Sequence, residues 1–249
     1  MVTFSFESFG KLKLVISRLE KLASDISMII LPDRCLFFDS NIFLEYSSIE
    51  IINGVVPNEG IQFRLNLTNL HNITKNIPAG CKCNLKLVGD NRLHIITSDS
   101  KKKTKIRENC CKVEIKKEEV SINQDRNNIL KNLDSIYDLN NKICINIANA
   151  LWSLERLYQS FDSMYLKFKE SNLELIGECN EYNGVSIINY ESIGGTSLID
   201  MSVCSSNLFK QFWLLELVSS ECIFFLDSIS LEICASARSD DEKILIFLS

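Results

Sequence analysis

Few residues of this chain could carry acid–base, nucleophilic or metal chemistry. Two histidines, His71 and His94, occur among 249 residues, and the ten cysteines include close groups at 81–83 and 110–111. Neither cysteine group has the spacing of paired zinc-binding arms. His94 lies in RLHIIT, which alternates like a strand, and a single strand histidine is more often packed than catalytic. We therefore assign no catalytic residue, no metal site and no cofactor.

Phosphate-binding loops are also missing from the sequence. The nine glycines include the pair Gly194-Gly195, but there is no GxGxxG and no GxxxxGK[ST] sequence. Such loops are the usual means by which a backbone holds phosphate groups. An enzyme of the small-molecule class stays open only if its site residues come together through the fold.

Composition indicates a folded intracellular protein. Hydrophobic residues make up 46% of the chain and charged residues 24%, which is enough apolar material for one large core or two ordinary ones. No apolar run approaches the roughly 20 residues of a membrane span, and the start MVTFSFESFG lacks the layout of a signal peptide. The cysteines are therefore expected to be reduced. A net charge of −5 excludes a simple polybasic nucleic-acid binder, so any DNA-binding charge must be confined to one face.

Hydrophobic periodicity then predicts the elements of the first half. Apolar residues at i, i+3, i+4 and i+7 spacings predict a helix over 9–24 with one buried stripe. Thr68 or Asn69 is expected to cap a second helix that ends near residue 77. Period-2 alternation and turn residues predict strands at 2–6, 26–31, 35–38, 42–51, 61–67, 83–88, 92–97 and 111–117.

The second half repeats this order. LEKLASDISMII begins at Leu19 and the similar LERLYQSFDSMYL at Leu154, 135 positions later. Helices are predicted over 149–161 and about 205–215, and strands at 142–147, 163–168, 172–178, 184–190, 197–203, 222–227, 231–236 and 243–248. A repeat of this length is the size of a domain. The sequence therefore predicts an α+β fold made of two tandem copies of a unit with two helices packed on an antiparallel sheet.

Three segments follow from the repeat: a first domain over 1–117, a connector over 118–141 and a second domain over 142–249. The connector is polar and rich in asparagine, and it has no glycine. Ile129, Leu133 and Ile136 are spaced so that one side could lie on a surface. We interpret the connector as an ordered tether with an anchoring face.

Several segments resemble a known family. They are LVISRLEKLASDISMIILPDRCLFF (14–38), IQFRLNLTNLHNITKNI (61–77) and the ending KILIFLS. The chain resembles the DNA sliding clamps, the family of proliferating cell nuclear antigen, and is most similar to the Hus subunit of the heterotrimeric DNA-damage checkpoint clamp. The order of elements covers nearly the whole chain, whereas residue-level similarity is confined to these segments. IQFRLNLTNL is also similar to the Rad subunit of the same ring.

The resemblance implies a non-enzymatic subunit of a nuclear ring that encircles double-stranded DNA. Its helices would line the inner surface, a clamp loader would place it on DNA, and repair and checkpoint proteins would dock on it. Basic residues on inward helices would supply attraction to phosphates without base contacts. Outside the apolar stripes, the expected helices offer Lys11, Lys13, Arg18, Lys21, Lys75, Arg156 and Lys210.

Ordinary surface helices also carry lysines, so no single one of these residues decides the matter. Together they outnumber the acidic residues on the four helices of an acidic chain. Glu20 and Glu155 dilute this charge, so binding should be weak and salt-sensitive. The densest basic run, at 101–107, is expected to be a solvated loop between two strands that could touch DNA at the rim or a clamp loader.

Protein contacts are the second implied function. The resemblance places a docking site for short hydrophobic motifs beneath the connector, at positions corresponding to Phe38, Ile129, Leu133 and Leu245. These side chains could instead simply hold the connector down. Subunits would join by pairing sheet edges, and the matching strands here are 111–117 and 184–190. Either strand could instead be a protected edge in a monomer.

Two other functions stay open. A homotrimeric replicative clamp that tethers a polymerase would have the same fold, and a small-molecule enzyme with a duplicated α+β fold belongs to a different class. A homotrimer in solution would favour replication. A chain that binds related clamp subunits would favour the checkpoint ring, and turnover with a metal or nucleotide requirement would favour an enzyme.

Overall fold

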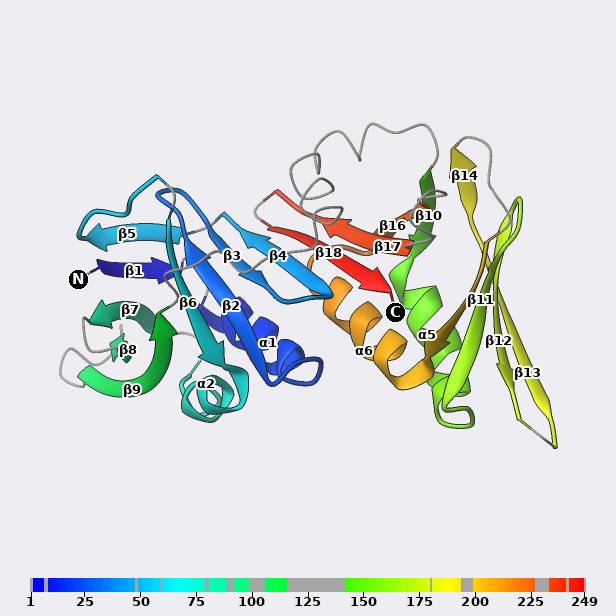
Figure 1. Ribbon diagram of the computed structural model, residues 1–249, viewed down its shortest axis with the longest axis horizontal. Helices are drawn as coiled ribbons and strands as arrows, with labels where there is room; N and C mark the ends of the chain where they lie inside the picture. The colour runs from blue at the N-terminus through cyan, green and yellow to red at the C-terminus, as the bar shows by residue number, and fades with distance from the viewer. Residues whose placement is uncertain are drawn as a thin grey trace. The chain divides into compact units, whose positions relative to one another are not determined.

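A computed structural model gives the architecture (Figure 1). It describes residues 2–6, 9–47, 49–58, 60–78, 81–88, 92–98, 106–115, 142–179, 181–193, 199–226, 233–240 and 242–248. These residues form two compact units. The first comprises the described residues of 2–39, 43–115 and 240–243, and the second those of 40–42, 142–239 and 244–248. The predicted connector over 118–141 lies outside the described residues.

The first unit is one antiparallel sheet with two helices. Its elements are β1 (Val2–Phe6), α1 (Phe9–Leu19), β2 (Asp25–Ile30), β3 (Cys35–Phe38), β4 (Ile42–Tyr46), β5 (Ile49–Asn53), β6 (Ile61–Asn66), α2 (Leu67–Thr74), β7 (Lys82–Val88), β8 (Arg92–Ser98) and β9 (Ile106–Ile115). The strand order is β4-β3-β2-β6-β9-β8-β7-β1-β5. Strand β9 joins the two parts of this sheet, because it pairs with β8 along residues 106–112 and with β6 along residues 113–115.

The second unit has two sheets. Its elements are β10 (Lys142–Asn146), α5 (Ile147–Tyr158), β11 (Ser163–Phe168), β12 (Asn172–Glu178), β13 (Asn183–Asn189), β14 (Glu191–Ile193), β15 (Ile199–Cys204), α6 (Ser205–Leu215), β16 (Glu221–Leu226), β17 (Ile233–Arg238) and β18 (Glu242–Leu248). One sheet has the order β14-β10-β16-β17-β18 and the other the order β13-β12-β11-β15.

The two units repeat one plan. Among the described residues, each half of the chain has nine strands and two helices in the same order. The pairings correspond as well, since β1 lies between β5 and β7 as β10 lies between β14 and β16. Likewise β2 lies between β3 and β6 as β11 lies between β12 and β15. The predicted α+β duplication is confirmed.

Some boundaries differ from the prediction. The expected strand over 42–51 is two strands, because β4 ends at Tyr46 and β5 begins at Ile49 to pair with β1. Helix α1 ends at Leu19, earlier than residue 24, although a backbone hydrogen bond from Ala23 to Leu19 continues one more turn. Strand β14 was not predicted, since three residues are too short to show a period.

Asparagine residues cap the N-termini of two of the helices. The Oδ1 of Asn66 accepts a hydrogen bond of 2.9 Å from the Asn69 backbone N–H at the start of α2. The Oδ1 of Asn146 accepts one of 3.0 Å from Asn149 at the start of α5. Because asparagine in an extended conformation satisfies an otherwise unpaired N–H, each cap contributes about 1 kcal/mol. The predicted cap at Thr68 or Asn69 is therefore wrong: Asn66 caps the helix, which begins at Leu67 and ends at Thr74 instead of near residue 77.

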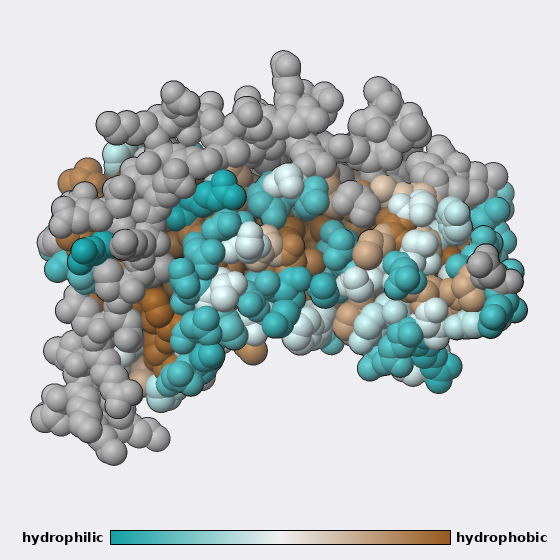
Figure 2. All heavy atoms as spheres, turned by 60° about the horizontal axis from the view of Figure 1, so that its bottom comes forward, coloured by the Kyte–Doolittle hydropathy of each residue, from teal (hydrophilic) through white to brown (hydrophobic). Residues whose placement is uncertain are grey.

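Each helix buries one stripe in its own unit. Helix α1 contacts α2, which also contacts β2, β6 and β9, and α5 contacts α6, β10, β12 and β13. The buried stripe of α1 is Phe9, Leu12, Val15, Ile16 and Leu19, and that of α5 is Ile147, Ala150, Ser153, Leu154 and Leu157. The opposite side of each helix faces solvent, and hydrophilic residues cover much of the described surface in Figure 2. No described helix has the length and hydropathy needed to cross a membrane.

Candidate nucleic-acid interface

The basic residues of the first unit differ in the groups that their side chains contact. Lys11, on α1, forms an ion pair of 2.6 Å with the carboxylate of Glu242 at the start of β18. The lysine side chain is 36% exposed and the glutamate side chain 0%. A carboxylate removed from water is costly unless a cation accompanies it. Lys11 therefore has a structural role that the sequence pattern does not reveal.

Lys13 is bound to the end of helix α2. Its Nζ donates to the backbone carbonyl of Lys75, and at 2.9 Å to that of Ile77. The last carbonyls of a helix have no partner within the helix and carry partial negative charge, so an ammonium group there is stabilising. Lys13 thus fastens α1 to α2, and its charge is already partly used within the unit.

Three further cations lie around the helices of the first unit. Arg18 is half-buried near the end of α1. Lys21 is exposed and forms an ion pair of 3.2 Å with Glu20. Lys75 is exposed, and its Nζ donates to Asn72 Oδ1 at 2.7 Å within the same turn. Such contacts between exposed groups are weak and can exchange for a phosphate oxygen.

One cation of the second unit lies beside an aromatic ring. The guanidinium of Arg156 lies 3.8 Å from the ring centroid of Trp152, one turn earlier on α5. Trp152 is 58% exposed, which is unusual for so large an apolar side chain. The chain has two tryptophans. The pair of Arg156 and Trp152 is a cation–π contact on the solvent side of the helix. Trp152 was not among the predicted site residues, although its position four residues before Arg156 was a signal.

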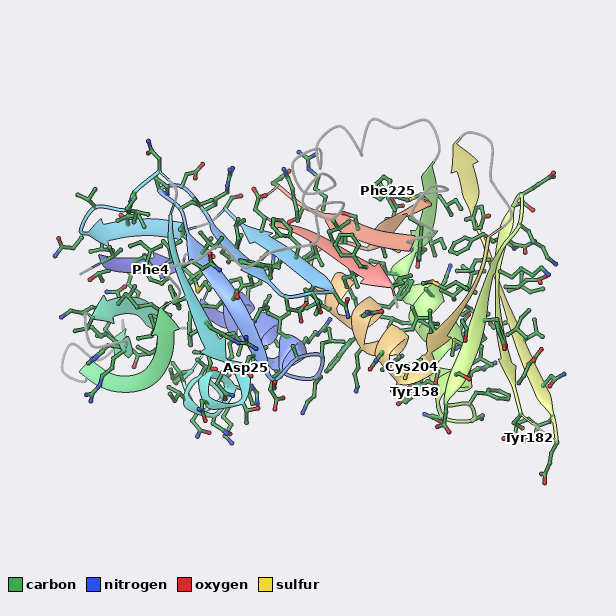
Figure 3. All side chains as sticks on the ribbon, in the orientation of Figure 1. Phe4, Asp25, Tyr158, Tyr182, Cys204 and Phe225 are labelled. Atoms are coloured by element: carbon green, nitrogen blue, oxygen red, sulfur yellow. The ribbon has the colours of Figure 1, made fainter. Side chains whose placement is uncertain are left out.

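Cys204 precedes α6 and is labelled in Figure 3. The charge of Lys210, on α6, acts on the thiol of this residue. A hydrogen bond with the Ser206 hydroxyl lowers the pKa of this exposed thiol most, followed by a hydrogen bond with the Asn207 backbone, with a smaller effect from the charge of Lys210. Buried thiols behave in the opposite way, and burial raises the pKa of Cys83 to about 12. Among the described residues, no three histidine, cysteine or acidic side chains gather as metal ligands would.

The residues expected to form a docking site are placed only in part. Phe38 is 3% exposed and Leu245 0% exposed, so both side chains are packed in the core. Ile129 and Leu133 lie outside the described residues. Of the basic run at 101–107, only Ile106 and Arg107 are described, and both belong to β9.

Each of the two strands expected to join subunits has one edge whose backbone groups pair with no described strand. Strand β13 is the end strand of its sheet and pairs only with β12 among the described strands. Strand β9, predicted over 111–117, spans residues 106–115, and its residues 106–112 pair on one side with β8. Its other side in that stretch pairs with no described strand. Unpaired backbone groups of this kind accept a strand from another chain.

Comparison with known proteins finds a similar fold among solved structures. No family model matches the sequence, and no curated protein matches it. Among solved structures, the chain is similar to the proliferating cellular nuclear antigen from Entamoeba histolytica, with a TM-score of 0.74 and 13% sequence identity. The alignment covers 100% of this chain and 98% of that chain. At this identity the likeness establishes the architecture, and the chain therefore has a PCNA-like clamp fold.

Proposed function

We propose that this chain is a non-enzymatic subunit of a DNA sliding clamp, a ring that encircles duplex DNA and carries other proteins along it. The observation that carries the proposal is the duplicated unit of nine strands and two helices among the described residues, with a PCNA-like fold over the full chain. A ring that slides needs attraction to phosphates without contacts to particular bases. Exposed lysine and arginine side chains in the helices or in the turns that directly follow them meet that need.

The DNA-facing residues within this proposal are of two kinds. Lys21, Lys75 and Arg156 are exposed, and each contacts a near neighbour in the chain through an interaction of low energetic value. Arg18 and Lys210 are half-buried and add to the same field. Lys11 and Lys13 hold structure as well, so their charges are less available. Few cations on an acidic chain suit a weak, salt-sensitive association.

Ring closure within this proposal uses strand pairing. The unpaired edge of β13 would take the β9 edge of a neighbouring subunit, which makes a head-to-tail interface. We assign the chain to the heterotrimeric checkpoint clamp, as its Hus subunit, because the segments 14–38 and 61–77 resemble that subunit. A homotrimeric replicative clamp is the second candidate, since the solved relative is a proliferating cellular nuclear antigen. Either ring would act in the nucleus, with a clamp loader, and repair and checkpoint proteins would dock near the connector.

Charge reversal tests the DNA surface. The triple variant Lys21→Glu, Lys75→Glu and Arg156→Glu is expected to weaken binding to a fluorescent duplex. It should also flatten the slope of log affinity against log salt by about 0.9 for each phosphate that the protein no longer neutralises. Fluorescence anisotropy over a salt series measures both effects.

A matched control changes the same charge elsewhere. Arg64, Lys82 and Arg92 are also exposed, but they lie on strands β6, β7 and β8. Their triple reversal should leave the salt slope close to that of the unaltered chain. If the strand variant loses as much affinity as the helix variant, DNA does not bind at the helices and the proposal is wrong.

A further inference from the structure

Strand β13 is an unusually unprotected sheet edge. Natural edge strands are usually guarded by charged residues, prolines or bulges, which prevent pairing with other chains. The seven residues of β13, NGVSIIN, contain no charged residue and no proline. Three other strands at the ends of described sheets each carry an acid: Glu50 in β5, Glu191 in β14 and Asp200 in β15.

One cross-strand row on the outer face of the same sheet is apolar and ends at this edge. Val185 and Ile187 of β13 are each 58% exposed. Val185 lies opposite Ile176 of β12, which lies opposite Tyr165 of β11, and Tyr165 is 45% exposed. An apolar row thus crosses three strands and ends at the free edge. Contiguous exposed apolar surface of this kind marks an interaction site.

We propose that the free chain forms a two-fold symmetric homodimer in which β13 pairs antiparallel with β13 of a second copy. A two-fold axis through Ser186 places Val185 of each copy opposite Ile187 of the other. Every cross-strand pair within Asn183–Asn189 then joins uncharged residues, so no like charges meet along β13. The apolar row continues from one sheet into the other, and both free edges are covered at once.

This dimer and a clamp ring exclude each other, because both would use the β13 edge. That consequence rests on the proposed function, whereas the dimer itself does not. A free subunit would keep its exposed edge covered until a partner strand replaces the second copy. The pairing is isologous, unlike the head-to-tail contact of a ring.

Sedimentation of the purified chain over a range of concentrations tests the proposal. We expect a species of twice the 28.4 kDa chain mass. Ile187→Lys should raise the dimer dissociation constant by about 100-fold, because two apolar side chains leave the interface and two ammonium groups enter it. The matched control is Val55→Lys, which adds the same charge at a residue that is 86% exposed in the other unit. It should sediment like the unaltered chain.

A charge-pair rescue tests the register. Val185→Glu alone should also be monomeric, but a mixture of Val185→Glu and Ile187→Lys chains should form a heterodimer, because residue 185 of one copy faces residue 187 of the other. A monomeric or trimeric unaltered chain, a dimer that Ile187→Lys leaves intact, or a mixture that stays monomeric would each overturn the proposal. Circular dichroism checks that Ile187→Lys and Val185→Glu are folded. If only one of them folds, that variant alone tests whether the dimer mass is lost. Failure of the chain to bind DNA or clamp subunits would leave this dimer and its rescue unchanged.

Discussion

Replacing Lys11 with methionine is expected to lower the free energy of unfolding by about 3 kcal/mol, because a buried carboxylate loses its cation. The Glu242 side chain is fully buried and its ion pair with Lys11 is 2.6 Å long. Methionine keeps the length and the apolar stem of lysine, so most of the packing is kept. Urea denaturation followed by circular dichroism measures the change.

Two further variants separate charge from packing in this prediction. Lys21→Met removes a lysine that is 55% exposed and should change the stability by less than about 0.5 kcal/mol. The double variant Lys11→Met with Glu242→Met should regain most of the stability, since an apolar pair can replace a buried ion pair at little cost. A stability loss in Lys11→Met no larger than that in Lys21→Met would contradict the structural role of this lysine.

Gly177→Ala is expected to destabilise the second unit by about 2 kcal/mol, because the site is already full. A Cβ at Gly177 would lie 2.3 Å from the ring of Phe161, and one at Gly184 would lie 2.7 Å from the same ring. These two glycines are cross-strand partners on β12 and β13. The ring of Phe161 lies over the gap that they leave and is 6% exposed. Thermal and urea unfolding of the variant measure the cost.

A double-mutant cycle shows whether the ring is the cause. Phe161→Leu makes room, so Gly177→Ala should cost clearly less in that background than in the unaltered chain. Glu178→Ala, at the exposed next residue, is the control and should have little effect. Equal costs of Gly177→Ala in both backgrounds would mean that the contact with Phe161 does not limit this site.

Local patterns predicted the elements well where a period was long enough to read. Strands 35–38, 163–168 and 172–178 and the helix over 205–215 have the predicted bounds. The repeat at 135 residues led directly to the duplicated α+β unit. The sequence pattern did not predict the break between β4 and β5. The segment SSIEI continues the apolar alternation of IFLEY, although the backbone turns there so that β5 pairs with β1. Pairing with a distant strand leaves no local signal.

Roles that depend on distant contacts could not be predicted. Lys11 and Lys13 have the helical spacing of solvent-facing residues, yet one meets Glu242 and the other the carbonyls after α2. The partner of Lys11 lies more than 200 positions away in the chain. In contrast, Lys21, Lys75 and Arg156 are exposed, as their positions outside the apolar stripes indicated. The sequence therefore identifies the basic residues that lie outside the apolar stripes. Contacts with distant segments then determine which of these side chains are exposed to solvent.

The central claim, that a ring containing this chain encircles DNA, is tested by topological retention. The ring, assembled from this chain and its partner subunits, is loaded onto nicked circular duplex DNA and washed at high salt, which removes electrostatic binders. We expect the protein to stay on the circles and to leave when a nuclease linearises them. Release from intact circles by salt alone, or equal retention on linear DNA, would contradict the account.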